Sequence, residues 1–451
     1  MSAVRLPNDF SNCRLQIDSF GINAKTTMKN TRIILAAFLA SAAAIPAFAQ
    51  FDVEDEPNVT VIVGDKSNPE EVEIEFVRNA PAQKRIHGLP RFAIVGNDRK
   101  FYLGVGAQFL GEGVFDFGDA MPSPVDFVPS TITPAAKGDR GSFRFSALTS
   151  SFYINAVALP GTKNRVGLFF KAEINNGNDY GFSVSHFYVN YRGFNVGYTS
   201  TLFQDGAAMP FTIDNQGPNG SAAMTVFTAN YTQDFGKGFS GAIGIENPTA
   251  DMDCGSHARQ VSQRIPAVPL YLQYAWGGGA SHIRLSGMVR PLQYRDLVAD
   301  KNRTICGAGV QLSGLVSVAD PFTLYYGATY GKGIADYMQD DTGMNLDAVA
   351  EGVSGKCKAM TTFGVTAGLS YKLTDRLTFN GVYSHLLNSR PDDTVVDGDT
   401  YRYGDYVAAN LYYTFNKILA AGIEYDYGHV ADFNNSRRHT NRIQAQLAVS
   451  F

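Results

Sequence analysis

The last ten residues, 442–451, read RIQAQLAVSF, and their alternation decides the fold class. The odd positions carry Ile443, Ala445, Leu447, Val449 and Phe451, whereas the even positions are mostly polar. Successive side chains of a β-strand point to opposite faces of the sheet, so the stretch predicts a strand with one face suited to lipid and one to water.

Comparable stretches of about ten residues recur from Phe101 onward and are separated by Gly, Asn, Asp and Pro clusters. Sixteen are found, near 100–115, 142–157, 165–175, 181–192, 194–203, 223–234, 239–247, 269–276, 281–291, 303–315, 321–331, 359–373, 377–387, 405–416, 418–428 and 440–451. Short connections alternate with long ones, near 117–140, 204–222, 248–268, 332–358, 388–404 and 429–439. Short periplasmic turns alternating with long external loops are typical of outer-membrane barrels.

A sheet in hydrocarbon must close, because each open edge would leave backbone N–H and C=O groups unpaired at a cost of several kcal/mol apiece. Sixteen strands leave an aqueous lumen, whereas about eight would be filled by side chains. We therefore expect an all-β, transmembrane antiparallel β-barrel. A secreted β-sandwich or β-helix is the alternative, but it does not explain aromatic residues at strand ends, such as Tyr325 and Tyr326.

Composition agrees with a barrel in a membrane. Of 451 residues only 18% are charged, against about 25% in soluble domains. The formal net charge of −4 gives no support to a nucleic-acid partner. The 45% hydrophobic content argues against a disordered chain.

The N-terminal sequence predicts export. Residues 28–49 combine a basic start, an apolar run and an Ala-Phe-Ala end, which is the pattern of a cleaved signal peptide. Signal peptides begin at the initiator, so residues 1–27 are interpreted as a misassigned upstream start, with Met28 the true one. Residues 50–98, rich in acidic residues and without heptads, are expected to be a short, partly disordered periplasmic segment. The barrel then spans 99–451, in the bacterial outer membrane.

The mature chain keeps three cysteines, Cys254, Cys306 and Cys357. Cys254 and Cys357 fall in long external loops, where a disulfide is permitted, and we expect that these two can pair. No zinc spacing, phosphate loop or other cofactor motif occurs, so no cofactor is expected. The scattered histidines give no catalytic pattern, and an enzyme is disfavoured.

Several motifs resemble one family. Ser200–Phe203 reads STLF, 213–220 reads IDNQGPNG, and Glu246–Pro248 reads ENP; 100–117 and 142–155 also fit. Together they resemble the DcaP-like porin family, clearly over about 100–250. The resemblance implies a trimeric sixteen-stranded porin for small anions, dicarboxylates especially. The terminal Phe451 is similar to the C-terminal signature of outer-membrane proteins, and is the expected assembly signal.

Transport through a fixed pore needs width and an electric field rather than covalent chemistry. Residues 204–221 form the third external loop, and general porins fold this loop into the lumen, so we expect it to build the constriction. The remaining candidates come from strand alternation, which places their charges on the inner face. The predicted solute path comprises Arg144, Lys171, Glu173, His186, Asp205, Asp214, Glu246, His282, Arg284, Arg290 and Arg442.

Basic side chains at a narrow point attract anions, but a salt-bridged wall is the alternative. Arg284 and Arg290 are expected to be steps of a basic ladder along one strand. The predicted function is passive diffusion of small hydrophilic solutes, anions such as dicarboxylates in particular. A phosphate-selective or general porin, or a structural or adhesin barrel, remain open. Expected partners are outer-membrane lipid and lipopolysaccharide, the barrel assembly machinery and further copies in a homotrimer, without nucleic acid.

Overall fold

A computed structural model describes residues 61–64, 69–82, 90 and 92–451. The predicted signal peptide and upstream start lie outside these residues. In the part that is described, no helix is both long enough and apolar enough to span a membrane.

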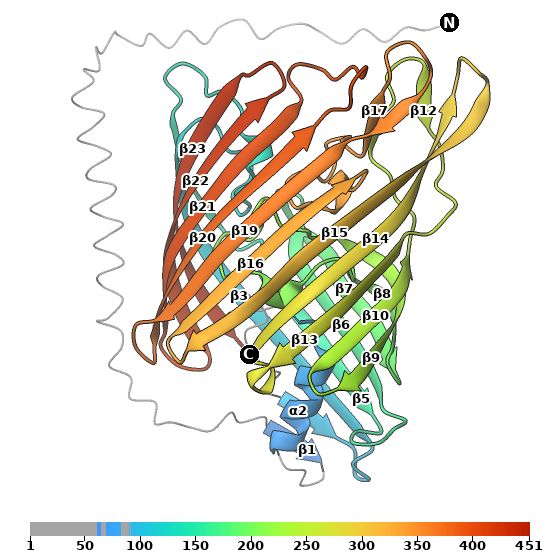
Figure 1. Cartoon of the computed structure of the whole chain (residues 1–451). Coiled ribbons are helices and arrows are strands. Elements are labelled where there is room, and N and C mark those ends of the chain that lie inside the picture. The colour runs from blue at the N-terminus through green and yellow to red at the C-terminus, as the bar shows by residue number, and fades with distance from the viewer. Residues whose placement is uncertain (1–60, 65–68, 83–89, 91) are drawn as a thin grey trace, which may run out of the picture. The chain divides into compact units, whose positions relative to one another are not determined.

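Sixteen antiparallel strands close into a barrel, as predicted (Figure 1). The last strand pairs with the first, with Arg442 opposite Asp116, so the sheet has no free edge there. One of the sixteen is interrupted at Ala147–Ser150 and counts as β4 plus β5. The strands are β3 (Phe101–Gly118), β4 (Gly141–Ser146), β5 (Ser151–Ala158), β6 (Val166–Asn176), β7 (Asp179–Tyr191), β8 (Phe194–Ser200), β9 (Thr225–Gly236), β10 (Phe239–Glu246), β13 (Val268–Trp276), β14 (Ser281–Asp296), β15 (Lys301–Ala319), β16 (Phe322–Lys332), β19 (Thr361–Lys372), β20 (Leu377–Ser389), β21 (Tyr401–Thr414), β22 (Leu419–Asp432) and β23 (Arg437–Ser450).

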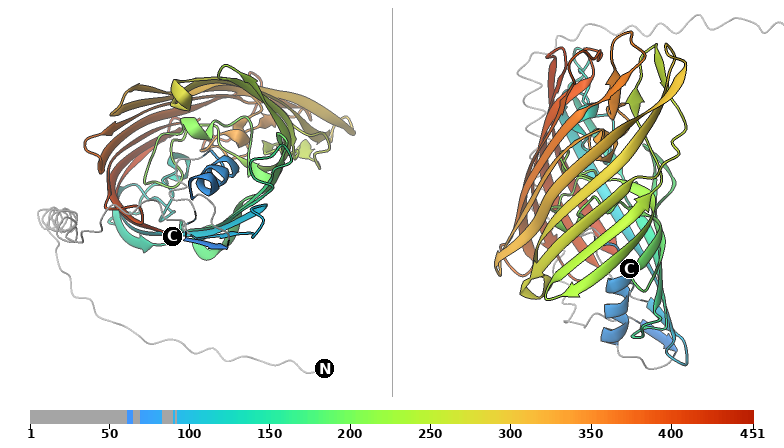
Figure 2. Two further views of the ribbon diagram at one scale, coloured as in Figure 1. Left: turned by 90° about the horizontal axis from the view of Figure 1, so that it is seen from below. Right: turned by 45° about the vertical axis from the view of Figure 1, so that its right-hand side comes forward.

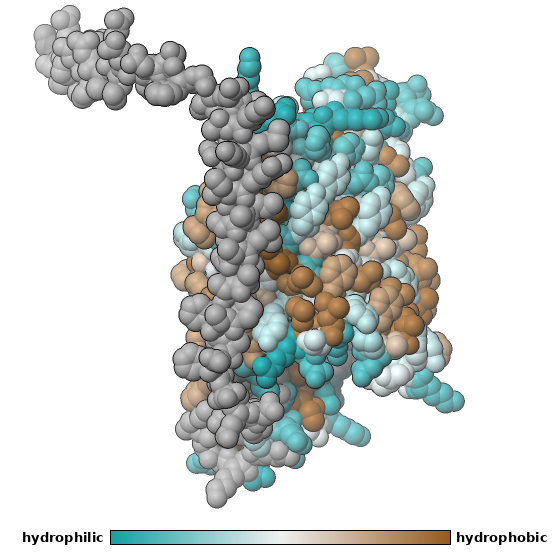
Figure 3. Space-filling view, turned by 90° about the vertical axis from the view of Figure 1, so that its left-hand side faces the viewer, coloured by the Kyte–Doolittle hydropathy of each residue, from teal (hydrophilic) through white to brown (hydrophobic). Residues whose placement is uncertain are grey.

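The predicted alternation of faces is present along the strands. On β23, Arg442 and Gln444 are buried inside, whereas Leu447 on the opposite face is 45% exposed. Apolar side chains gather at mid-height on the outer surface of the barrel, with hydrophilic ones above and below (Figure 3). Members of this outer set include Phe109, Leu285, Leu312, Phe363, Leu411 and Leu447. A lipid-facing band of this kind is what an outer-membrane barrel requires.

The segment before the barrel is more ordered than the sequence suggested. It contains β1 (Val61–Gly64), α2 (Pro69–Asn79) and β2 (Phe92–Val95). β2 pairs with the start of β3, Phe92 opposite Val105, and so extends the sheet at the end that carries the short turns. The partial disorder expected for other parts of 50–98 stays a prediction, whereas these three elements are ordered. The reason is tertiary: Val72 and Phe76 of α2 are fully buried against Tyr102 and Val157.

The long external loops turn inward and fill part of the lumen (Figure 2). Their apolar side chains make one buried cluster with the inner wall, including Phe127, Phe203, Tyr337 and Tyr406. Two loops also share a small sheet made of β11 (Met252–Asp253), β17 (Ala348–Ala350) and β18 (Cys357–Ala359). β12 (Ala258–Gln260) adds to the outer end of β14. The short 3-10 turns are η2 (Pro129–Thr131), η3 (Gly206–Ala208), η4 (Gly277–Gly279) and η5 (Ala335–Tyr337).

Candidate functional site: the lumen and its third external loop

The loop 204–221 lies inside the barrel and begins with a tether to the wall. Asp205 Oδ2 is 2.8 Å from His282 Nε2 on β14 and accepts a hydrogen bond of 2.8 Å from Ser313 on β15. Arg284 Nη1 lies 3.8 Å from Asp205 Oδ1. Burial alone would raise the pKa of Asp205, but the His282 hydrogen bond and the Arg284 charge together lower it. Asp205 is thus a buried carboxylate that fixes the loop on β14 and β15.

A second tether holds the middle of the loop against β22. Glu424 accepts hydrogen bonds from the backbone N–H groups of Ile213, at 2.8 Å, and Asp214, at 2.5 Å. Asp214 in turn accepts from the Phe127 N–H at 2.7 Å and from the Tyr406 hydroxyl at 3.0 Å. Since each buried polar atom left without these partners would cost about 1–3 kcal/mol, the loop is held in one place.

The end of the loop runs directly over β20. The Gly220 N–H donates to Ser384 Oγ at 2.8 Å, and a Cβ at Gly220 would stand 2.3 Å from the His385 carbonyl oxygen. Only glycine fits this approach, which explains the Gly in the 213–220 motif. The loop therefore packs on β14, β15, β20 and β22, and leaves the opposite wall uncovered.

The uncovered space is a polar cavity of about 320 Å³ between the loop and strands β6 to β9. Its only charged lining groups are Lys171 and Glu173 on β6, whose Nζ and Oε1 atoms are 2.9 Å apart. An adjoining hollow of about 40 Å³ touches the same two side chains and Phe211. The lining is otherwise neutral: Ser185, His186, Ser200, Gln204, Gly206, Met209, Pro210, Phe211, Thr212, Asn215, Gln216, Gly217, Pro218, Ala223, Met224, Thr225 and Gln339.

Three of the eleven predicted path residues thus line this cavity: Lys171, Glu173 and His186. His186 is buried, with Nδ1 2.9 Å from Thr199 Oγ1. Ser185 also faces inward because a bulge lies between Lys171 and Ala172 in the pairing with β7. The bulge could not be read from simple alternation.

The four predicted arginines are paired with carboxylates, and Arg290 and Arg442 are also buried. Arg442 and Arg144 both bind Asp116, and Arg442 is fully buried. Arg290 is 1% exposed, with Nη1 2.8 Å from Asp347 of the loop 333–360. The expected basic ladder of Arg284 and Arg290 is therefore corrected: inward-folding loops neutralise Arg290 and cover it, and only Arg284 keeps partial exposure.

Other predicted residues serve the loops rather than the cavity. Glu246 accepts from the Leu202 N–H at 3.1 Å and from the Tyr337 hydroxyl at 2.9 Å. Asp205, Asp214 and His282 form the tethers described above. Arg284 lies over the Tyr271 ring at 4.1 Å and donates to Gln273 at 2.8 Å. The contacts of Glu246 join residues far apart in sequence, so face alternation could not reveal them.

Sequence reasoning missed the neutral side chains that make up most of the lining. Gln204 and Gln216 lie in the predicted loop, but only charges had been selected there. Gln339 belongs to the sixth external loop and meets the third, where Gln216 Nε2 donates to its carbonyl at 2.8 Å. No signal in the sequence indicated this meeting of loops.

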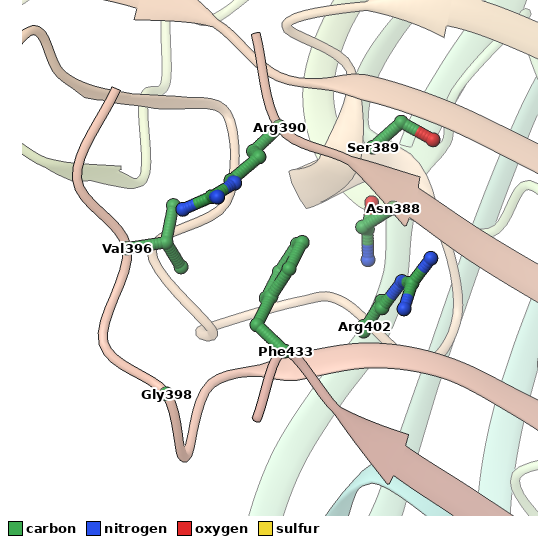
Figure 4. A pocket seen from close by; sticks show the side chains of 7 residues that line it. All are labelled: Asn388, Ser389, Arg390, Val396, Gly398, Arg402 and Phe433. Atoms are coloured by element: carbon green, nitrogen blue, oxygen red, sulfur yellow. The ribbon is translucent and has the colours of Figure 1, made fainter. Parts of the chain in front are cut away.

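A second hollow, of about 410 Å³, opens among the outer ends of β20, β21 and β22. Arg390 and Arg402 line it, and Figure 4 shows the Phe433 ring between their side chains. Arg390 makes no ion pair with any residue that the structure describes, and Arg402 has one long hydrogen bond, 3.4 Å, to Asn435. Nearby Asp393 faces Lys358 instead. Unlike the lumen arginines, these two make no salt bridge with a residue that the structure describes.

Cys254 and Cys357 lie close together, and their predicted disulfide stays a prediction. Both are buried in one cluster with Tyr294, and a hydrogen bond joins their two thiols. They are free thiols here, as is the exposed Cys306. The contact connects the loop after β10 to the loop after β16.

Phe451 follows directly on the closing strand. Its N–H donates to the Ala107 carbonyl at 2.8 Å, and its carbonyl accepts from the Ala107 N–H at 3.2 Å. Among the described residues, no cluster of three or more His, Cys, Asp and Glu side chains could hold a metal ion.

Comparison with known proteins decides the family. A model of the Porin subfamily matches residues 161–449. The chain belongs to this porin family. The porin is a channel of the bacterial outer membrane rather than an enzyme, and its family and fold agree on this.

Solved structures share the fold of this porin. The outer membrane channel DcaP of Acinetobacter baumannii superposes with a TM-score of 0.69 at 18% identity, covering 78% of this chain and 97% of that one. The expected likeness to DcaP is thereby confirmed for the fold. An anion-selective porin from Comamonas acidovorans superposes with a TM-score of 0.49 at 10% identity, covering 78% of this chain and 100% of that one. The trimer form of OmpT from Vibrio cholerae superposes with a TM-score of 0.47 at 10% identity, covering 78% of this chain and 99% of that one. No curated protein sequence matches the chain.

Proposed function

We propose that this porin is a passive diffusion channel for small hydrophilic solutes, and that solutes pass between the loop 204–221 and the inner wall of β6 to β9. The observation that carries the proposal is the polar cavity at this place, with the loop tethered to the opposite wall. Hydroxyl and amide groups along the lining offer hydrogen bonds to a solute without holding it tightly, which conduction requires.

A preference for small organic anions, such as dicarboxylates, is the finer proposal. The Lys171–Glu173 pair is self-neutralising, so the constriction contributes little field. Support comes from the outer mouth, where Arg390 and Arg402 line a hollow beside Phe433 without a salt bridge to a described residue. Guanidinium groups bind carboxylates well, so this pair offers a site for a passing organic anion.

Ion preference tests this directly. In a planar bilayer with a salt gradient, the wild-type reversal potential should show weak anion preference. The double variant Arg390→Gln/Arg402→Gln should move it towards zero, whereas Arg437→Gln, an exposed arginine at the same rim, should leave it unchanged. Cation preference in the wild type would overturn the anion proposal but not the channel. Preference for phosphate over carboxylates would favour a phosphate-selective porin, and no conductance at all would favour a structural or adhesin barrel.

We also propose a homotrimer, assembled through the outer face of β3 to β7. This face carries a concentration of exposed rings: Phe145 is 80% exposed, Phe182 75% and Phe187 53%. The interrupted strand at β4 and β5 lies in the same region. Replacing Phe145 and Phe182 with Ser should yield monomers on a native gel. Tyr330→Ser, an exposed ring on β16, should leave the wild-type assembly intact.

Export and insertion complete the proposal. Residues 28–49 act as a cleaved signal peptide after a true start at Met28, 50–98 lie in the periplasm, and 99–451 form the barrel. The barrel assembly machinery would recognise the end at Phe451, and the apolar outer band would contact lipid and lipopolysaccharide. N-terminal sequencing of the mature protein should begin at Gln50.

A further inference from the structure

Helix α2 lies against the inner wall at the periplasmic end of the barrel, below the constriction. Seen from below, α2 falls within the ring of strands (Figure 2). We infer that α2 forms a second constriction on the solute path, and that Asn79 and Glu75 hold it there. This inference rests on the proposed channel function and adds the element that limits the exit.

The sequence of α2 explains why it stays on the wall. The side chains of Val72, Glu75, Phe76 and Asn79 follow helical spacing and are all buried, so one stripe of the helix faces the barrel. Glu70 and Glu71 in the first turn and Arg78 in the last complement the helix dipole. The opposite face remains open, since Ile74 is 57% exposed.

Asn79, at the end of α2, is bound by three strands. Its Nδ2 donates to Asn155 Oδ1 at 2.6 Å and to the Leu168 carbonyl at 2.9 Å. Asn190 Nδ2 donates to its Oδ1 at 2.5 Å, and the Tyr188 hydroxyl donates to its backbone carbonyl at 2.7 Å. A single asparagine therefore joins α2 to β5, β6 and β7.

One turn earlier, an ion pair adds to this attachment. Arg165 binds Glu75 through its side chain and donates to the Glu75 carbonyl at 3.1 Å. The Gly161 N–H donates to Glu75 Oε1 at 3.1 Å. The Glu75 and Arg165 side chains are 8% and 11% exposed, so water screens the pair little.

The attachment lies on the strands that form the cavity wall. From Leu168 to Lys171 is three residues along β6, or roughly 10 Å. Between the two levels, Phe169 stacks on Tyr188 with ring centroids 5.7 Å apart. A solute that has passed Lys171 on this wall therefore meets α2 next.

Gly167 on β6 offers a test that acts from the wall rather than from the helix. A Cβ at Gly167 would stand 1.9 Å from Asn79 Oδ1 and 2.7 Å from Asn190 Oδ1. Alanine there must displace the Asn79 side chain and break its hydrogen bonds. If α2 constricts the exit, adding a methyl group to the pore wall should enlarge the pore, the opposite of its simple steric effect.

The experiment compares wild type, Asn79→Ala, Gly167→Ala and Tyr330→Ser in full-length protein. Single-channel conductance and swelling of liposomes by sugars of increasing size are measured, and heat-modifiable gel mobility confirms that each barrel is folded. We expect conductance to rise about 1.5-fold in Asn79→Ala and Gly167→Ala, with larger sugars admitted, and no change in Tyr330→Ser, whose exposed ring lies on β16 away from α2.

The outcomes separate this inference from the function on which it rests. One outcome is that the wild type conducts while Asn79→Ala and Gly167→Ala show the same conductance or a lower one. That result would overturn the role of α2 but leave the proposed channel function intact. If Gly167→Ala fails to fold, the conductance of Asn79→Ala alone tests the role of α2. Asn79 is not part of a barrel strand, so we expect the barrel of this variant to fold. A wild type without conductance or swelling would instead overturn the proposed function.

Discussion

The carboxylate of Asp205 lies 2.8 Å from the imidazole of His282, although 77 residues separate them in the chain. This contact brings the start of the third external loop onto β14 deep in the barrel. Because the loop is held there and by Glu424 on β22, a polar cavity remains between the loop and β6 to β9. The position of the proposed solute path follows from where the loop is anchored.

Asp205→Ala should release the start of the loop. Removing one partner of a buried ion pair costs about 3–5 kcal/mol, because Arg284 loses its counter-charge and His282 its hydrogen-bond partner. Chymotrypsin should then cut at Phe211 much faster than in the wild type, and open-channel current noise should rise. Asp205→Asn keeps a hydrogen-bond acceptor, so its cleavage rate and current noise should lie between those of the wild type and Asp205→Ala. Equal protection of Phe211 in all three proteins would contradict the anchoring role.

Lys171 and Glu173 should have opposite effects on ion preference. A unit charge about 5 Å from a passing ion is worth about 0.8 kcal/mol in water, or roughly fourfold in local ion concentration. Lys171→Gln should therefore shift the reversal potential towards cations and Glu173→Gln towards anions. In about 1 M salt both shifts should shrink, since screening then acts over about 3 Å. Shifts of the same sign would contradict a balanced pair.

Arg284→Glu should shift preference less than Lys171→Glu does. Arg284 is only 14% exposed and already faces Asp205 and the Tyr271 ring, so it contributes little free charge to the path. Reversal potentials of the two variants in the same salt gradient give the comparison. A larger shift of the reversal potential in Arg284→Glu than in Lys171→Glu would contradict this prediction and support a basic wall along β14.

Cys254 and Cys357 should form a disulfide in the oxidising exterior. Their thiols already touch, and the bond would link two loops across about 100 residues, which favours stability by about 2–5 kcal/mol. Mass spectrometry of unreduced protein should find the two peptides joined, with Cys306 free as the internal control. Three free thiols in protein isolated without reductant would rule the bond out.

Removing Phe451 should impair assembly more than it affects a folded barrel. Phe451 adds two backbone hydrogen bonds to Ala107 at the seam where the barrel closes. Outer-membrane levels of the deleted chain should fall, while barrel already folded in detergent keeps near wild-type thermal stability. Normal levels in the outer membrane would count against an assembly signal.

Sequence alone could predict the barrel because lipid and water impose a period of two on every strand. Arg442 and Leu447 were assigned to opposite faces on that basis, and the structure agrees. Alternation says which way Arg290 points, but not that Asp347 from a distant loop will cover it. The role of α2 was equally hidden, because Asn79 gains its partners only when β5, β6 and β7 lie side by side.

The most direct test of the solute path is a comparison of two cysteines in a Cys306→Ser background. Ser185 lines the cavity, whereas Ser286 is 1% exposed on the wall of β14, on the side where the loop is anchored. A charged thiol reagent is added while single-channel conductance is recorded. The account predicts a stepwise fall in conductance for Ser185→Cys and none for Ser286→Cys. Block of Ser286→Cys with Ser185→Cys unaffected would contradict it.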